Sequence, residues 1–164
     1  MVMKFLVLLI LVLSSFKVVA TQQIEETLDL GGVRFNIEEF PLESHPKYTA
    51  LVEKVGSGVC SASWRGYKGI WSIGQDKLYL FHVIKDPCGE KSEYLDPAEL
   101  MGMEETDVVA QWYTGKITFR ISRKSYLNRS SEGVSGETYE AVVYQIKNGN
   151  VLSRSIEKVE YLWQ

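Results

Sequence analysis

The clearest pattern in the chain is an alternation of apolar and polar residues on both sides of two glycines. In the segment TLDLGGVRFNI, Gly31 and Gly32 form a two-residue turn of the kind that joins antiparallel strands. This turn predicts the following cross-strand pairs: Leu30 with Val33, Leu28 with Phe35, Glu26 with Ile37, and Asp29 with Arg34. One face of the predicted hairpin is apolar and the other is charged, so we expect one face to contact solvent.

Two short helices are predicted between the strands. One helix is predicted over Pro46–Val55, where apolar residues recur at helical spacing and Pro46 suits a first helical turn. The Gly-Ser-Gly segment that begins at Gly56 is expected to end this helix. The second helix begins at Asp96, where an N-cap aspartate is followed by Pro97 and by Glu99 at the capping-box position.

Tryptophans and glycines in SASWRGYKGIWSI indicate a bent strand. Trp64 and Trp71 have opposite parity, so an unbroken strand would point them to opposite faces. A β-bulge at Gly66 or Gly69 would return both side chains to one face. The segment QWYTGKITFRI repeats this order of tryptophan, glycine and regular alternation, which predicts a curved sheet.

The remaining strand signals complete the predicted fold. Residues 77–84 (KLYLFHVI) are apolar on both parities, which is typical of a central strand covered on both faces. Near the C-terminus, Asn148-Gly149 separates two long strand-like segments. We therefore predict a mainly β fold, with a single antiparallel curled sheet, small barrel or sandwich of about seven to nine strands, up-and-down connectivity and one or two short helices.

Residues 1–20 have the pattern of a secretory signal peptide. Lys4 precedes an unbroken apolar run over Phe5–Leu13, and the small residue Ala20 suits cleavage before Thr21. The run is too short to cross about 30 Å of hydrocarbon, so we expect no membrane span after cleavage. The sequence thus predicts a single β-rich domain over residues 21–164, exported to the periplasm or the cell exterior.

Charge and cysteine content narrow the possible partners. The 18 Lys and Arg include two in residues 1–20, which hold none of the 21 Asp and Glu, so residues 21–164 carry a net charge of −5. Such a balance argues against nucleic acid or an anionic membrane as the main partner, since both favour a concentrated basic face. In an oxidising compartment Cys60 and Cys88 are expected to form a disulfide, although the sequence alone leaves them free to be two thiols.

The residues with the best binding chemistry are aromatic, with one arginine among them. Aromatic rings and arginine are the usual anchors of protein interfaces, and rings also stack on sugars. The candidate binding residues are Trp64, Arg65, Tyr67, Trp71 and Tyr113. By parity we expect Arg65, Tyr67 and Tyr113 to be exposed and Trp64 to be buried. The alternative is that the tryptophans only fill the core.

No segment carries a recognisable catalytic or metal-binding motif. His82, Asp86, Cys88 and Glu90 lack metal-ligand spacing, and we expect no metal or cofactor. No Gly-x-Ser-x-Gly nucleophile turn is present in the sequence. The acidic residues Glu104, Glu105 and Asp107 favour a solvated turn, with a small hydrolase that uses these carboxylates as the alternative.

Four segments, taken in order, carry a resemblance to other proteins. They are Pro41-Leu42-Glu43, Trp64-Arg65-Gly66-Tyr67 followed by Trp71, Leu78-Tyr79-Leu80, and Trp112-Tyr113-x-Gly115. In these segments the chain resembles a group of small bacterial β-rich proteins without an assigned activity. The resemblance implies a bacterial origin and adds no chemistry.

Size, export and acidity together favour a binding role over catalysis. We expect an exported interaction protein that engages a protein or a glycan, through an exposed sheet face or through the loop over residues 86–107. An immunity or inhibitor protein that neutralises a secreted effector and a component of the cell envelope are two specific forms of this hypothesis.

Overall fold

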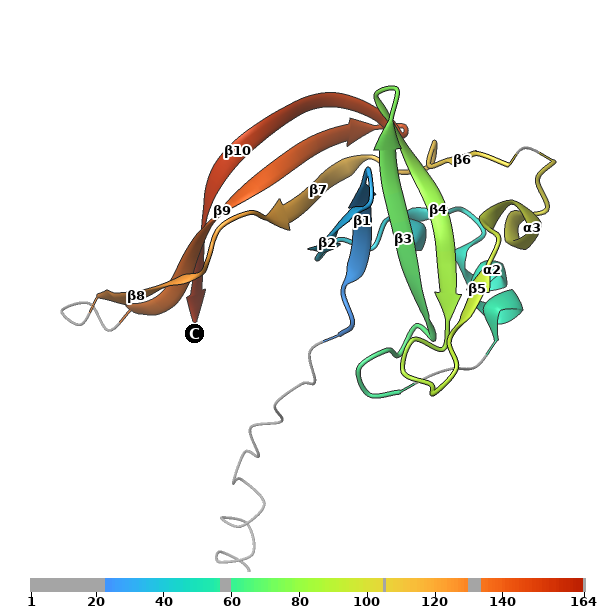
Figure 1. Cartoon of the computed structure of the whole chain (residues 1–164), viewed down its shortest axis with the longest axis horizontal. Helices are drawn as coiled ribbons and strands as arrows, with labels where there is room; N and C mark the ends of the chain where they lie inside the picture. Colours follow the sequence, from blue (N-terminus) through green and yellow to red (C-terminus); the bar gives the residue numbers. More distant parts are fainter. Residues whose placement is uncertain (1–22, 57–59, 105, 130–133, 164) are drawn as a thin grey trace, which may run out of the picture.

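The computed structural model describes residues 23–56, 60–104, 106–129 and 134–163 (Figure 1). The predicted signal peptide lies outside these residues. Within the described ranges, ten strands form a single mixed sheet, which is not closed into a barrel, and two α-helices and a 3₁₀ helix lie beside it. Within the described residues, no helix has both the length and the apolar character needed to cross a bilayer.

The elements follow one another in this order: β1 (Glu26–Leu30), β2 (Val33–Ile37), the 3₁₀ helix η1 (Pro41–Ser44), α2 (Tyr48–Val55), β3 (Tyr67–Gly74), β4 (Lys77–Lys85), β5 (Glu93–Leu95), α3 (Pro97–Met101), β6 (Val108–Val109), β7 (Gly115–Arg120), β8 (Ser125–Arg129), β9 (Val134–Lys147) and β10 (Asn150–Trp163). In space the main path is β2-β1-β3-β4-β10-β9-β7. The short strands β5 and β6 pair with β4, and β8 pairs with β9.

The first hairpin, the end of α2 and the start of α3 are confirmed, whereas α2 begins at Tyr48 and not at Pro46 as predicted. β1 and β2 form the predicted hairpin in the predicted register, including Leu30 opposite Val33 and Asp29 opposite Arg34. Helix α2 ends at Gly56, whose φ of 79° is easy only for glycine. Helix α3 begins after Asp96, whose side chain accepts a hydrogen bond from the Ala98 N–H at 2.8 Å.

The connectivity differs from the prediction. Mainly β structure with short helices is confirmed, but up-and-down order is wrong, because β1 lies parallel to β3 and the C-terminal strand β10 lies beside β4. Both contacts are made by segments far apart in the chain, so the short turns on which the prediction was based could not reveal them.

Side chains join the two ends of the curved sheet where no strand ladder does. Phe35 of β2 packs on Phe119 of β7 with ring centroids 4.3 Å apart. Glu39, which follows β2, accepts a hydrogen bond from the Thr118 backbone N–H at 2.9 Å. The core enclosed by this curve includes Leu28, Ile37, Trp71, Leu78, Leu80, Val83 and Ile117.

A long hairpin extends away from this core. β9 and β10 each have 14 residues and turn at Asn148-Gly149, both with positive φ, as predicted. Figure 1 shows the hairpin arching outward, with β8 along its far end. β10 meets β4 only at Asn150, opposite Lys77, so the distal part of the hairpin is a three-stranded extension.

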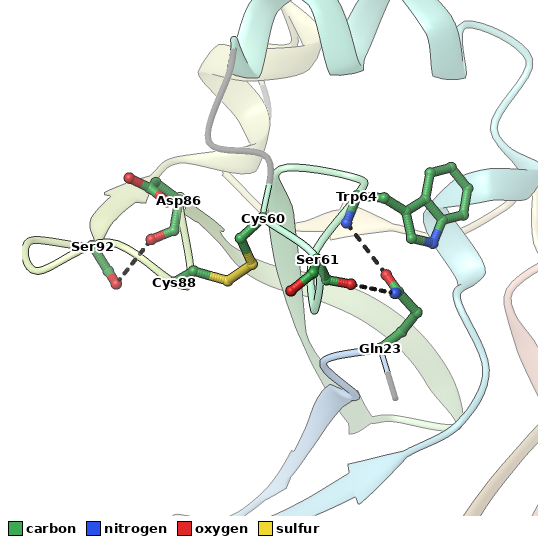
Figure 2. The surroundings of a disulfide bond; sticks show 7 residues. All are labelled: Gln23, Cys60, Ser61, Trp64, Asp86, Cys88 and Ser92. Carbon is green, nitrogen blue, oxygen red and sulfur yellow. Dashed lines mark hydrogen bonds between the residues drawn. A yellow bond between two sulfur atoms is a disulfide. The ribbon is translucent and has the colours of Figure 1, made fainter. Parts of the chain in front are cut away.

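The predicted disulfide is present between Cys60 and Cys88 (Figure 2). It joins the turn before β3 to the loop after β4, at the end of the sheet opposite the β3–β4 turn. The Gln23 side chain binds the same turn, where it donates to the Ser61 carbonyl at 3.1 Å and accepts from the Trp64 N–H at 3.3 Å. This end of the domain is therefore held by covalent and polar links.

Replacement of both cysteines by serine is expected to lower the free energy of unfolding by about 3–4 kcal/mol, because the open chain regains the entropy of a closed loop of 28 residues. Urea unfolding of the double variant beside the oxidised parent measures this loss. The parent protein with its disulfide reduced is the matched control and should show the same loss of unfolding free energy. A stability unchanged by both treatments would contradict the predicted role of the disulfide.

Candidate functional site

β4 contains a β-bulge beside which a groove opens on the surface. β3 and β4 are in register up to Ile70 opposite His82, and the next pair is Trp71 opposite Leu80. Phe81 is therefore the extra residue. A bulge of this kind changes which face the following residues occupy. Leu80 and Val83 are buried, while Phe81 and His82 between them both line the outer face of the strand.

The neighbouring strands leave space at this bulge. On one edge of β4, β5 pairs with Val83–Lys85 and β6 pairs with Tyr79–Leu80, so neither of them pairs with Phe81 or His82. The chain between β5 and β6, which includes α3, lines the opening with Asp96, Pro97, Thr106 and Asp107. The result is an open groove of about 650 Å³ on the outer face of the β3–β4 hairpin.

Aromatic side chains form part of the wall of this groove. Phe81 and Tyr94 have 52% and 56% of their surface exposed, although both are large and apolar. The His82 ring lies between them, with its centroid 4.3 Å from that of Phe81 and 5.7 Å from that of Tyr94. Polar groups from Asp107 and Gln75 lie on the same lining. The groove thus combines stacking surfaces with hydrogen-bonding groups, the composition typical of ligand sites.

The apolar run over 77–84 predicts a strand covered on both faces, so the sequence does not single out these residues as a site. That interpretation is correct for the inner face and wrong for the outer one. The available signal was the pair Leu80-Phe81, two adjacent large apolar residues at the point where the bulge lies.

The predicted exposure pattern of the tryptophan–arginine segment is reversed in the structure. Trp64 is 56% exposed, whereas Arg65, Tyr67 and Trp71 are buried. The parity argument failed because β3 begins only at Tyr67. Trp64 and Arg65 belong to the preceding turn, which ends at Gly66 with a φ of 73°. The bulge expected in this strand at Gly66 or Gly69 is not there: the register shift between Ile70 and Trp71 comes from the extra residue Phe81 in β4, and Trp64 stays outside the core.

Tyr113 is also buried, contrary to the prediction. Its hydroxyl donates to the Lys116 carbonyl at 2.6 Å, and burial raises its pKa above the usual value. The neighbouring Trp112 is half-buried, and its indole N–H donates to the Pro41 carbonyl at 3.0 Å. The structure therefore gives both Tyr113 and Trp112 a hydrogen bond to the backbone.

Arg65 supports Trp64 from below. Its guanidinium lies 3.4 Å from the ring centroid of Phe40 and 4.7 Å from that of Trp64, and its Nε donates to the Glu43 carboxylate. This arrangement combines cation–π contacts with an ion pair at a buried arginine. Trp64 is thus an exposed ring that packs on a buried, ion-paired arginine, and it does not line the groove beside β4.

A buried carboxyl group, that of Glu26, interacts electrostatically with Arg65. The Glu26 side chain is fully buried and accepts a hydrogen bond from the Trp71 indole, while its Oε1 has no hydrogen-bond partner. Loss of hydration raises the Glu26 pKa to about 7, against the opposing effects of the Trp71 and Gly69 N–H groups and of Arg65. Gly69 is needed beside it, since a Cβ there would lie 2.8 Å from the Glu26 Oε2.

The other candidate groups are dispersed. Within residues 23–56, 60–104, 106–129 and 134–163, no three His, Cys, Asp or Glu side chains are placed to hold a metal ion. Of the three acidic residues considered for hydrolysis, Asp107 lines the groove, Glu104 is exposed elsewhere, and Glu105 lies outside the described residues.

Comparisons with known proteins give no information on function. No protein-family model, no curated protein and no solved structure matches the chain. The bulge at Phe81, the groove beside it and the exposed Trp64 are consequently the features from which a function can be argued.

Proposed function

We propose that this protein is an exported binding protein without catalytic activity, and that its partner binds in the groove beside the β4 bulge. The observation that carries the proposal is the exposure of Phe81 and Tyr94 in the lining of a groove of about 650 Å³. Large exposed aromatic rings in a concave site are unusual on a surface that contacts only water, and they are frequent anchors of binding sites.

Export is supported by two independent features. Residues 1–20 have the charge and hydropathy pattern of a signal peptide. The Cys60–Cys88 bond belongs to a type of link that persists in oxidising compartments such as the periplasm or the cell exterior. A bacterial origin, proposed from the resemblance above, would place the protein in one of these compartments.

The proposed partner is a protein or a glycan. Phe81 and Tyr94 offer rings on which a sugar face or an apolar side chain can stack, and Gln75 and Asp107 offer hydrogen bonds to hydroxyl or amide groups. An immunity or inhibitor protein would hold a loop of a secreted effector in this groove. An envelope component would hold a glycan or another envelope protein there.

The test uses a glycan array and affinity capture from a bacterial secreted-protein fraction, both with the oxidised protein. The double variant Phe81→Ala/Tyr94→Ala should bind a saturable partner with an affinity lower by about 30-fold or more, since aromatic anchors contribute on the order of 2 kcal/mol to binding. Tyr126→Ala, at a highly exposed tyrosine on β8, is the matched control and should bind normally. Equal binding by the parent and the double variant would contradict the proposal.

One observation favours a second function, a small hydrolase that uses acidic residues. Asp107 and His82 line the same groove, so a carboxylate and an imidazole share one site. Hydrolysis of an array glycan or of a peptide library by the parent, abolished in Asp107→Asn, would support this alternative. Activity that survives in the Glu104/Glu105/Asp107 triple alanine variant would exclude these carboxylates.

A further inference from the structure

The distal part of β10 has a free edge. β10 reaches β4 at Asn150, and the Val151 N–H donates to the Asp76 carbonyl. From Ser153 to Trp163, the only strand of the described chain that pairs with β10 is β9. Figure 1 shows this stretch as the outer border of the arch. An edge of this length presents a row of backbone N–H and C=O groups to another strand.

This edge lacks most of the devices that keep strands apart. It contains no proline, and its one irregularity, between Val151 and Ser153, precedes the free segment. Its large apolar residues are exposed on both faces: Ile156, Tyr161, Leu162 and Trp163. A long exposed edge with large apolar side chains is a template for pairing with another strand.

The charges on β10 select a second copy of the same chain as the occupant. Two copies related by a two-fold axis pair antiparallel, and the residue on the axis lies opposite itself. With Val159 on the axis, Lys158 of each copy lies opposite Glu160 of the other, and Ile156 lies opposite Leu162. Both kinds of pair stabilise an antiparallel ladder.

Neighbouring registers are unfavourable for the same reason. A centre at Glu157, Lys158 or Glu160 places that charged residue opposite its own copy. A centre at Ile156 places Arg154 opposite Lys158. Among these five registers, only the one centred on Val159 pairs opposite charges and avoids like charges.

We propose that β10 forms a two-fold homodimer by antiparallel pairing over Ser155–Trp163, centred on Val159. The Lys158 and Glu160 side chains of one chain already lie 3.1 Å apart along the strand, so they exchange partners with their symmetry copies without any change of backbone. Pairing would join the two arched extensions into one continuous sheet. The dimer leaves the β4 groove open and does not depend on the proposed binding function.

A charge-swap experiment tests this register. Lys158→Glu and Glu160→Lys each create like-charge pairs at both symmetric positions, so each should weaken the dimer about tenfold or more in sedimentation equilibrium. An equimolar mixture of the two variants should recover the parental affinity as a heterodimer, because every Glu then faces a Lys. Arg154→Glu changes the net charge as Lys158→Glu does but lies outside the paired segment, so its dimer should persist.

Circular dichroism of each variant confirms that it is folded before sedimentation. A parent that stays monomeric up to its solubility limit would overturn the proposal, as would capture of a foreign strand by a monomeric parent. So would a mixture that fails to dimerise, or an Arg154→Glu variant that dissociates as completely as Lys158→Glu.

Discussion

Replacement of Trp71 by alanine should lower the free energy of unfolding by about 4–5 kcal/mol, close to the entire stability of a typical domain. Trp71 has no exposed surface and lies in the central core, so its removal leaves a cavity that the neighbouring strands cannot close. The same change deprives the buried Glu26 carboxyl of its indole hydrogen bond. Guanidinium unfolding at pH 5 measures the loss.

The variant Trp71→Phe separates the stabilisation that comes from the ring in the core from that of the indole hydrogen bond to Glu26. This variant keeps an aromatic ring in the core and loses the indole N–H, so we expect a loss of about 1–3 kcal/mol, the cost of an unsatisfied buried acceptor. The loss should be larger at pH 8 than at pH 5, because the indole hydrogen bond favours the ionised form of Glu26. A Trp71→Ala variant as stable as Trp71→Phe would show that the ring does not fill the core.

Stability should decrease as the pH rises from about 4.5 to 7, and Glu26 is the main cause. Its ordinary pKa is 4.5, whereas burial raises the pKa in the folded protein to about 7. Between these values the unfolded chain has released the proton that the folded protein still holds, so a rise in pH favours unfolding. The shift of the Glu26 pKa from 4.5 to about 7 corresponds to a loss of about 3 kcal/mol in the free energy of unfolding. This loss is complete above pH 7.

Glu26→Gln is the variant that isolates this group. Glutamine keeps a carbonyl acceptor for Trp71 and cannot ionise, so the variant should gain about 3 kcal/mol relative to the parent between pH 4.5 and pH 8. Burial also raises the Glu39 pKa and lowers the His45 pKa, but both groups are present in the two proteins and cancel in the difference. A difference that does not change with pH would contradict the assignment to Glu26.

Local chemistry could be predicted from the sequence because a few neighbouring residues determine it. The Gly31-Gly32 turn fixes the register of β1 and β2 through backbone angles that only the turn residues set. Asp96 caps α3 through an amide two residues away, and Asn148-Gly149 needs no distant partner to reverse the chain. In each case the interaction that decides the structure lies within a few positions.

The candidate site could not be predicted, because distant pairings decide it. The bulge at Phe81 exists only because β3 pairs with β4 in a register that shifts between Ile70 and Trp71. The opening beside it depends on where β5 and β6 stop on the same strand. For Trp64, alternation was applied to a segment that is a turn, so the predicted faces were reversed at Arg65 as well.

Hydroxyl-radical footprinting of the protein, alone and saturated with the partner recovered by capture or on the array, tests the groove most directly. Binding beside the β4 bulge predicts that oxidation of Phe81 and Tyr94 falls strongly on saturation, while oxidation of Tyr126 stays constant. Unchanged oxidation of Phe81 and Tyr94, with protection at Trp64 instead, would place the partner on the tryptophan–arginine stack and contradict the proposed site.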